Sequence, residues 1–469
     1  MSFFNKIYNH SPLALQNLMV SAYGYAWKKR RFGGIFEQDL VAAKNRENFS
    51  TNQWVEFQQA ELQKILLHAQ AQVPYYTQKF AQAGLSTEKL ASIDLSTLNQ
   101  VPILSKQDLR AFGATTLLAR TREHGGSFFA SSGSTGTPTQ VLFSHSMHQR
   151  WSAIFEARIR HWAGVNRFTS RGMIGGRRVL PDASNTSPFY RYNFFEKQVY
   201  FSAYHISAQN ISNYVQGINK YHVQYMTGYA MSNFFLARFI QESKIQVNEQ
   251  KAVITSSEKL TQEMRDSFKA AYNCKTFDSW SGVEACALVS ECEHGSLHIS
   301  PDAGIVELLD DNMKPVPPNT LGNVYCTGFL NYDQPLIRYA IGDSMILSNE
   351  TCTCKRSMPV IKEIVGRTED VVIGKDGREM VRFHAIFNGL ISVAMAQVIQ
   401  HKIGEIILKV VPVALKVSEQ EIELMKQRVF SQLGDIEIII EEVNDIPLTA
   451  NGKFKAVIST VQRNSKIIT

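Results

Sequence analysis

The sequence has few or none of the features that would assign it to a specialised class of protein. Its six cysteines in 469 residues are too few for a disulfide scaffold. No apolar run approaches the roughly 18 uncharged residues that a membrane-spanning helix needs. No block of five or more like charges occurs, so a basic arm for nucleic-acid binding is not expected. The motifs G-x-S-x-G and H-E-x-x-H are also missing, which gives no support to hydrolases of those types.

The composition is that of an ordinary soluble globular protein. The chain is 44% hydrophobic and 19% charged, and its length allows one large domain and at least one smaller one. Lys and Arg total 49 against 42 for Asp and Glu, a formal net charge of +7. This mild excess favours anionic small ligands over nucleic acid. Residues 1–18 lack the charged-then-apolar order of a secretory signal, so we expect a cytoplasmic protein with reduced cysteines.

An amphipathic helix is predicted near the N-terminus. Its apolar residues share one face of a helix, and four consecutive basic residues follow at positions 28–31. We expect this helix to pack on its own domain, and docking at an anionic membrane surface is the alternative. The apolar residues are Leu15, Leu18, Met19, Ala22 and Ala26.

The rest of the chain indicates two domains. From about residue 125 to residue 365, short apolar runs alternate with helix-sized segments, a pattern that predicts an α/β domain. Beyond Gly366, the segments 406–411, 419–432 and 436–442 have the patterns of a strand, a helix and a strand. The sequence therefore predicts an α/β protein with a large domain of layered sheets and helices, residues 1–365, and a small α+β domain, residues 366–469.

A loop rich in glycine and hydroxyl residues directly follows the apolar run 128–130. Glycines allow a ligand to approach the backbone closely, and successive N–H groups and hydroxyls can donate to phosphate oxygens. A flexible surface loop has the same composition, so the loop alone leaves both interpretations open. It is not a Walker A loop, because no lysine follows its second glycine. The candidate phosphate-binding residues are Ser131, Ser132, Gly133, Ser134, Thr135, Gly136 and Thr137.

Four further motifs follow along the chain. The segment 278–284, DSWSGVE, ends an apolar run with a turn and an acid, and 332–343, YDQPLIRYAIGD, surrounds a short strand. The segment 366–370, GRTED, precedes another apolar run, and 446–453, IPLTANGK, places a lysine in a glycine turn. Taken singly, each charged residue here would be an ordinary surface residue.

In this combination and order, the motifs resemble those of the adenylate-forming superfamily of acyl-CoA synthetases, luciferases and peptide-synthetase adenylation domains. The likeness spans nearly the whole chain. It is greatest to the phenylacetate–CoA ligase branch, including its capsular-polysaccharide-associated subgroup. The resemblance implies ATP-dependent activation of a small carboxylic acid as an acyl-adenylate, release of pyrophosphate and acyl transfer to CoA. It also implies that the small C-terminal domain is a mobile lid with two orientations.

The resemblance assigns the phosphate and metal contacts to the first two motifs. Residues 131–138 would close over the β- and γ-phosphates of ATP, and Glu284 would hold the Mg²⁺ that bridges them. Ser281 and Gly282 would line the adenine and acyl side. The segment 228–232, GYAMS, resembles the family segment that lines the acyl pocket, although such aromatic residues more often belong to the core.

The remaining motifs would supply the contacts to ribose and α-phosphate. By the same resemblance, Asp343 would accept the ribose hydroxyls and Arg367 would contact ribose or α-phosphate. Lys453 would reach the α-phosphate and the attacking carboxylate. Two anions meet in such a reaction, so a cation and a metal must offset their repulsion in the transition state. Lys453, Glu284 and Arg367 are therefore the predicted catalytic residues.

A group of cysteines and histidines suggests a structural zinc ion. Cys292 and His298 form one pair and Cys352 and Cys354 another, and two ligands from each of two loops is a common zinc arrangement. The C-x-C spacing is tighter than the usual C-x-x-C, so buried thiols beside solvated histidines are the alternative. His294 is the substitute ligand. We expect Cys274, Cys286 and Cys326 to belong to the core.

The acceptor of the acyl group is left open by two departures from the wider superfamily. Thr139 and Gln140 stand where a lysine is common, and the segment 374–378 resembles deazaflavin-coenzyme adenylating relatives. Instead of CoA, an amine or a hydroxyl of a polysaccharide precursor could receive the acyl group, or AMP itself could be transferred. The alternative outside the enzymes is an inactive scaffold in capsule assembly, in peripheral contact with membrane-bound polysaccharide machinery.

Overall fold

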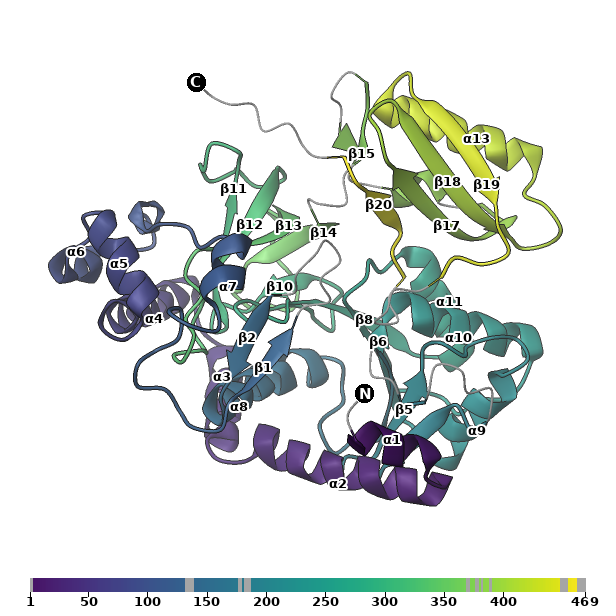
Figure 1. Ribbon diagram of the computed structural model, residues 1–469, viewed down its shortest axis with the longest axis horizontal. Coiled ribbons are helices and arrows are strands. Elements are labelled where there is room, and N and C mark those ends of the chain that lie inside the picture. The colour runs from purple at the N-terminus through teal and green to yellow at the C-terminus, as the bar shows by residue number, and fades with distance from the viewer. Residues whose placement is uncertain are drawn as a thin grey trace. The chain divides into compact units, whose positions relative to one another are not determined.

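The computed structural model describes residues 3–130, 139–175, 179–180, 187–367, 372–375, 379–380, 383–387, 390–447 and 454–461. The chain divides into two compact units (Figure 1). The larger unit comprises Met1–Ile341 and Met345–Ile364, and the smaller comprises Gly342–Ser344 and Val365–Thr469. None of the described helices has the length and apolar character that crossing a bilayer requires.

The larger unit begins with a series of helices. In α4, the buried residues Leu62, Ile65, Leu66 and Ala69 repeat at three- and four-residue spacing, which places them on one face. Ser50 begins this helix with a capping box that it forms with Gln53. The segments are α1 (Phe3–His10), α2 (Leu13–Phe32), α3 (Phe36–Arg46), α4 (Thr51–Gln72), α5 (Pro74–Gln82), α6 (Thr87–Ser92), η1 (Leu98–Gln100) and α7 (Lys106–Phe112).

The apolar stripe predicted for the N-terminal helix exists, but it faces solvent. Leu15, Leu18, Ala22 and Ala26 of α2 are all exposed, and the buried residues of the helix are Gln16, Ser21 and Gly24. The helix packs on its own unit, as expected, but through polar and small residues. Periodicity had correctly grouped the apolar residues on one face, and the structure turns that face outward.

A short hairpin and an irregular helix connect these helices to the main sheet. The strands β1 (Ser127–Ala130) and β2 (Gln140–Phe143) pair antiparallel. The helix α8 (His145–Phe155) follows and continues into one π-helical turn, η2 (Glu156–Arg160). The apolar residues of α3, α4, α5 and α8 join the sheet residues in one extensive core.

Twelve strands form one sheet in the order β11-β12-β13-β14-β10-β9-β8-β7-β6-β3-β5-β4. The central strands β5, β3, β6, β7 and β8 are parallel to one another. The strands are β3 (Arg171–Gly175), β4 (Tyr190–Asn193), β5 (Gln198–Ser202), β6 (Tyr225–Tyr229), β7 (Ala252–Ser256), β8 (Lys275–Trp280), β9 (Val289–Glu291), β10 (Leu297–Ile299), β11 (Gly304–Leu309), β12 (Leu321–Gly328), β13 (Tyr339–Leu347) and β14 (Val360–Arg367).

Helices connect the parallel strands. The chain runs from β5 through α9 (Ile211–Lys220) to β6, through α10 (Ala230–Ser243) to β7, and through α11 (Gln262–Tyr272) to β8. Parallel neighbours require such crossovers, because a tight turn can join only antiparallel strands. The apolar faces of these helices form a second core with β3, β5, β6 and β7. The three helices are at the right of Figure 1. The predicted α/β class is confirmed.

The smaller unit contains a four-stranded sheet in the order β19-β18-β17-β20. Buried residues of the sheet pack against Met425, Val429 and Leu433 of α13. The predicted strand, helix and strand of this region correspond to β18, α13 and β19. The elements are β15 (Val372–Ile373), β16 (Glu379–Met380), α12 (His384–Phe387), β17 (Val393–Gln400), β18 (Glu405–Pro412), α13 (Glu419–Leu433), β19 (Glu437–Glu442) and β20 (Val457–Ser459).

Candidate active site and cysteine–histidine cluster

Three parallel strands end side by side at the carboxyl edge of the sheet, where α/β folds bind ligands. Tyr229 at the end of β6 pairs with Ser256 on β7, which pairs with Ser279 on β8. Two of the sequence motifs therefore meet at this edge. The segment 228–232 spans the β6–α10 junction, and Ser281 and Gly282 begin the turn after β8.

Close packing of the backbone explains why the segment 228–232 begins with a glycine. Gly228 has a φ of +124°, and a Cβ on it would lie 1.8 Å from the carbonyl oxygen of Ile174 on the adjacent strand. A side chain of any kind is excluded there. Beyond it, the N–H of Met231 in the first turn of α10 donates to the carboxylate of Glu258 at 2.8 Å. The junction between β6 and α10 is thus fixed at both ends.

Glu284 is held inside the unit, although it is acidic and lies in a turn. Only 7% of the residue is exposed. The Tyr339 hydroxyl donates to its Oε1 at 3.0 Å, and the Thr139 hydroxyl donates to the same atom at 3.4 Å. A Cβ on Gly282 would lie 2.3 Å from its Oε2, so the glycine leaves room for the carboxylate. The predicted metal ligand is therefore a buried, oriented carboxylate rather than a solvated turn residue.

Tyr339 and Thr139 each join Glu284 to another predicted motif. Thr139 is the first described residue after the phosphate-loop segment, and Tyr339 belongs to the 332–343 motif. Burial and the nearby Glu284 carboxylate raise the pKa of Tyr339, so the phenol stays protonated as a donor. The structure thus brings Thr139, the turn after β8 and the start of β13 together around one carboxylate.

Of the remaining predicted residues, the structure describes some fully, one only by its backbone and others not at all. The loop residues 131–138 and Lys453 lie outside the described residues. Arg367 is the last residue of β14, and only its backbone is described. Asp343 lies on β13, in the segment Gly342–Ser344 that groups with the smaller unit. Ser281 donates to the carbonyl oxygen of Ala287 at 2.9 Å and so closes the turn that carries Glu284.

A second buried acid begins the same motif. Asp278 on β8 accepts hydrogen bonds from the N–H of Ser279 at 2.9 Å and from the Thr255 hydroxyl at 3.4 Å. Burial and the charge of Glu291 raise its pKa to about 7, against the opposing effect of Arg265. Asp278 therefore changes its charge near neutral pH, unlike an exposed aspartate.

The predicted zinc ligands form a compact cluster. One ligand atom from each of Cys292, His298, Cys352 and Cys354 lies within 4.8 Å of the others. The Cys292 and Cys352 sulfurs are 3.6 Å apart, and the Cys354 sulfur is 3.4 Å from His298 Nε2. In a tetrahedral zinc site, two thiolates lie about 3.8 Å apart and a thiolate lies about 3.6 Å from an imidazole nitrogen. All six cysteines are free.

Neighbouring groups orient the cluster for metal binding. His298 Nδ1 lies 3.2 Å from the Met358 carbonyl oxygen, so this nitrogen carries the proton and Nε2 is left with its lone pair. The Cys354 N–H points to the Cys352 sulfur at 3.4 Å. Burial raises the pKa of Cys292 to about 12, and a thiolate there needs a nearby cation. The donor set and its geometry fit zinc.

The cysteines and histidines outside this cluster have other environments. His294 Nδ1 lies 2.9 Å from the Thr353 hydroxyl, and His294 is not one of the four clustered residues. Cys286 and Cys326 are buried in the core, as expected, and Cys274 is only partly buried. Sequence reasoning therefore chose the four members of the cluster, with His298 rather than His294.

Two residues at the candidate active site were missed from the sequence. Thr139 follows the proline of the loop and was noted only for not being lysine, and Tyr339 lies inside a quoted motif without an assigned role. The signal that could have marked Tyr339 is its place beside Arg338 in a segment that also holds Asp343. Arg338 itself is structural, because it pairs with Glu307 at 2.9 Å.

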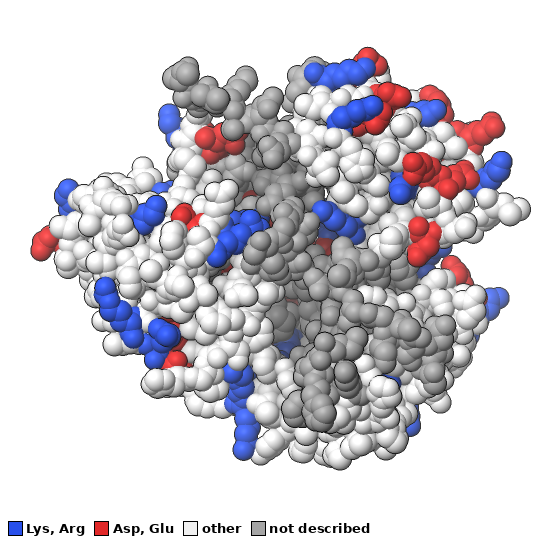
Figure 2. All heavy atoms as spheres, viewed as in Figure 1, with Lys and Arg blue, Asp and Glu red and all other residues white. Residues whose placement is uncertain are grey.

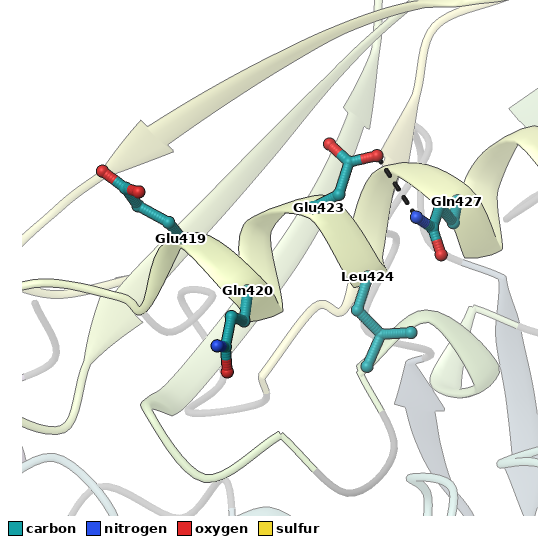
Figure 3. Close-up of a pocket in the computed structure, with 5 residues that line it drawn as sticks. All are labelled: Glu419, Gln420, Glu423, Leu424 and Gln427. Atoms are coloured by element: carbon teal, nitrogen blue, oxygen red, sulfur yellow. Dashed lines mark hydrogen bonds between the residues drawn. The ribbon is translucent and has the colours of Figure 1, made fainter.

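A hollow on the smaller unit is unsuited to binding an anionic nucleotide. It lies along one side of α13 and is lined by Glu419, Gln420, Glu423, Leu424 and Gln427 (Figure 3). Glu423 accepts a hydrogen bond from Gln427 at 3.3 Å, and the two carboxylates would repel an anionic nucleotide. On the face shown in Figure 2, the described Lys and Arg side chains are interspersed with Asp and Glu.

Comparison with known proteins relates the chain to CapK and to phenylacetate-coenzyme A ligases. The family profile described as the CapK C-terminal domain matches residues 372–460. Protein CapK of Staphylococcus aureus is 26% identical over 472 residues, which cover 98% of this chain and 100% of CapK. The phenylacetate-coenzyme A ligase of Thermus thermophilus is 24% identical over 335 residues, which cover 67% of this chain and 71% of that ligase.

A solved structure shows the same fold. The crystal structure of 2-hydroxyisobutyryl-CoA ligase in its postadenylation state, in complex with R3-HIB-AMP, superposes with a TM-score of 0.70. The match has 20% sequence identity and covers 89% of this chain and 91% of that one. The chain is therefore homologous to CapK and to the phenylacetate–coenzyme A ligases.

Proposed function

We propose that the protein activates a small carboxylic acid with ATP, releases pyrophosphate and passes the acyl group from the resulting acyl-adenylate to coenzyme A. The observation that carries this proposal is the buried Glu284 carboxylate, on which the Tyr339 and Thr139 hydroxyls converge at the carboxyl edge of the sheet. The kinship with phenylacetate–coenzyme A ligases supports the same reaction. Solved relatives of the same fold contain an acyl-AMP together with CoA.

The proposed first step joins two anions. A carboxylate oxygen of the substrate attacks the α-phosphorus of ATP, the bond from that phosphorus to the bridging β-oxygen breaks, and pyrophosphate leaves. A carboxylate is a ligand that Mg²⁺ prefers, so Glu284 fits as its protein ligand, and the ion would offset charge on the phosphates. In this proposal, residues 131–137 hold the β- and γ-phosphates, and Lys453 neutralises charge at the α-phosphate.

The remaining predicted contacts complete the site. We propose that Ser281 and Gly282 line the adenine and acyl side, that Asp343 accepts the ribose hydroxyls and that Arg367 contacts ribose or the α-phosphate. The small domain would act as the lid that brings Lys453 to the nucleotide. In the second step, the CoA sulfur attacks the acyl carbon, the bond to the AMP oxygen breaks and the thiol proton is lost to solvent.

We also propose that Cys292, His298, Cys352 and Cys354 bind one structural zinc ion. The ion would hold together the end of β9, the strand β10 and the connection between β13 and β14. Trp54 and Trp162 pack against the cluster, and four protein ligands would leave no position on the ion open to substrate. A closed site of four protein ligands supports folding rather than catalysis.

Carboxylate-dependent pyrophosphate release is the experiment that tests the enzymatic proposal. The purified protein is incubated with ATP, Mg²⁺ and a panel of aliphatic, hydroxy and aromatic acids, and Glu284→Gln serves as the matched inactive variant. A labelled acid then shows whether the acyl group reaches CoA, an amine or a sugar hydroxyl. Release that is fast in the wild type and lost in the variant supports adenylation. Binding of ATP without turnover on any acid would favour the inactive scaffold.

A further inference from the structure

The helix α2 presents its apolar side to solvent and its polar side to the protein. Leu18 is 64% exposed, and Leu15, Ala22, Tyr25 and Ala26 are also exposed. These positions follow one another at intervals of one, three or four residues and form one continuous stripe on the helix. Such an arrangement is the reverse of that in an ordinary surface helix, whose apolar stripe faces the core.

The inward polar face has a structural cause. The strand β4 is the last strand of the sheet, and an edge strand has backbone groups without partners. Asn17 of α2 accepts a hydrogen bond from the N–H of Tyr192 at 3.0 Å, and Ser21 accepts one from the N–H of Phe194 at 3.1 Å. Gly24 lets the helix approach, because a Cβ there would lie 2.0 Å from the Asn193 amide. The polar residues of α2 thus cover the sheet edge.

The apolar stripe continues onto the turn between β4 and β5. Phe194 is 67% exposed and Phe195 is exposed beside it. The Tyr25 and Phe195 rings lie 4.9 Å apart, so the helix and the turn form one surface. We call it the α2 apolar surface, made of Leu15, Leu18, Tyr25, Phe194 and Phe195. Figure 1 shows α2 lying lengthwise along the larger unit, beside α1.

The surroundings of this surface are basic. Residues 1–36 contain Lys6, Lys28, Lys29, Arg30 and Arg31 and no Asp or Glu. Lys29 is exposed and lies 4.7 Å from the centre of the Tyr25 ring, and Lys28 donates to the Phe195 carbonyl oxygen at 3.2 Å.

The acid nearest this surface in the chain is neutralised. Glu196, in the turn itself, is buried and pairs with Arg31 and with Arg171. Lys197, the next residue, is exposed. The net charge at the rim of the surface is therefore positive.

We propose that the α2 apolar surface docks on an anionic phospholipid membrane. A surface of exposed aliphatic and aromatic side chains that is flanked by lysines is typical of proteins that bind the headgroup region of an anionic membrane. The leucines and phenylalanines would enter the boundary of the acyl chains, and the lysines would contact lipid phosphates. The lysines can reach outward because their long aliphatic stems lie along the apolar surface.

Charge also argues against a second copy of this chain as the occupant. A twofold dimer would bring the same surface of both copies together, so two basic surfaces would be buried against each other, and residues 1–36 contain no Asp or Glu to offset their charge. A membrane rich in anionic lipid attracts the basic groups instead.

Vesicle sedimentation tests the proposal with the full chain. We expect binding to vesicles that contain phosphatidylglycerol, weak or no binding to pure phosphatidylcholine, and a loss of binding at high ionic strength. Each lysine near an anionic surface contributes about a fivefold change in affinity. The double variant Lys28→Gln/Lys29→Gln should therefore bind about 25-fold more weakly, and Leu18→Ser/Phe194→Ser should bind at least about tenfold more weakly.

Matched controls separate this effect from a general change in charge or apolarity. Lys269→Gln removes an exposed lysine of α11, and Leu415→Ser removes an exposed leucine of the smaller unit. Both should bind as the wild type does. All variants should have nearly the same melting temperature, because the altered side chains are exposed except for the half-buried Lys28, which makes one hydrogen bond to the Phe195 carbonyl oxygen. Equal binding of every variant, or no binding to anionic vesicles at low salt, would overturn the proposal. So would a dimer in solution that Leu18→Ser/Phe194→Ser dissociates, since it would identify a second copy as the occupant.

Discussion

The Tyr339 hydroxyl donates a 3.0 Å hydrogen bond to Oε1 of Glu284, and this contact orients the carboxylate that we propose as the Mg²⁺ ligand. Tyr339→Phe removes the donor and keeps the ring. It should lower kcat/KM for ATP about tenfold, the usual order for losing one hydrogen bond to a charged group. It should also raise the Mg²⁺ concentration needed for half-maximal activity, which a merely structural change would leave alone.

The matched control is Tyr214→Phe, because Tyr214 is equally buried and donates to the Ser202 carbonyl oxygen at 2.7 Å, away from Glu284. If Tyr339→Phe and Tyr214→Phe have the same Mg²⁺ dependence as the wild type, Tyr339 does not position a metal ligand.

Zinc analysis tests the cysteine–histidine cluster. Protein purified without chelator should contain about one zinc ion per chain, as a closed four-ligand site requires. Cys354→Ser should release the ion and lower the melting temperature, because metal binding contributes directly to folding. Cys274→Ser, outside the cluster, should keep the ion. A wild-type preparation without zinc would refute the site.

We expect Asp278 to make the protein less stable as the pH rises toward neutrality. Its pKa is about 7 in the folded protein and about 3.9 in an unfolded chain. Between these values the folded state binds more protons, so this group makes the free energy of unfolding fall as the pH rises from about 4 to about 7. Asp278→Asn removes the titration and keeps an acceptor for Ser279.

The variant should therefore match the wild type near pH 4 and exceed it at pH 8, by on the order of 4 kcal/mol. Urea unfolding at the two pH values measures the difference, and Asp266→Asn on the exposed side of α11 is the control. A variant that is less stable at both pH values would show that Asp278 is ionised and stabilising.

The phosphate-loop prediction concerns Gly133 and Gly136. A bulky residue at either position should raise the KM for ATP at least about tenfold, because a side chain obstructs the approach of phosphate to the backbone. The control is Gly84→Asn, at an exposed position where a Cβ meets nothing within 4 Å and whose φ of +67° asparagine tolerates. Unchanged ATP kinetics in both loop variants would identify the loop as ordinary surface.

Lys453 should act in only one of the two half-reactions. Lys453→Ala removes a cation from an anionic transition state and should slow adenylation by on the order of 100-fold or more. The transfer step, started from a synthetic acyl-adenylate, should remain largely intact, because in the proposed lid motion the lysine serves only the first orientation. Equal loss in both half-reactions would contradict the two-orientation account.

Local patterns predicted the elements well, because they depend on neighbours in the chain. The patterns of segments 406–411, 419–432 and 436–442 identified β18, α13 and β19, and the order of motifs identified the ligase fold. The contacts to Glu284 were beyond such reasoning. Tyr339 and Thr139 lie 55 and 145 residues away from it in the chain, and only the order of the strands brings them together. The direction of the α2 stripe was missed for a related reason, since periodicity groups residues on a face without showing what the face contacts.

Carboxylate-dependent exchange of labelled pyrophosphate into ATP measures the proposed adenylation most directly. The assay needs no knowledge of the acyl acceptor, because it reports only the reversible first step. We predict exchange by the wild type with at least one acid of the panel, and a loss of on the order of 100-fold in Glu284→Gln, with both proteins equally folded. Exchange that Glu284→Gln leaves unchanged, or no exchange with any carboxylate in a zinc-loaded, folded protein, would contradict the account.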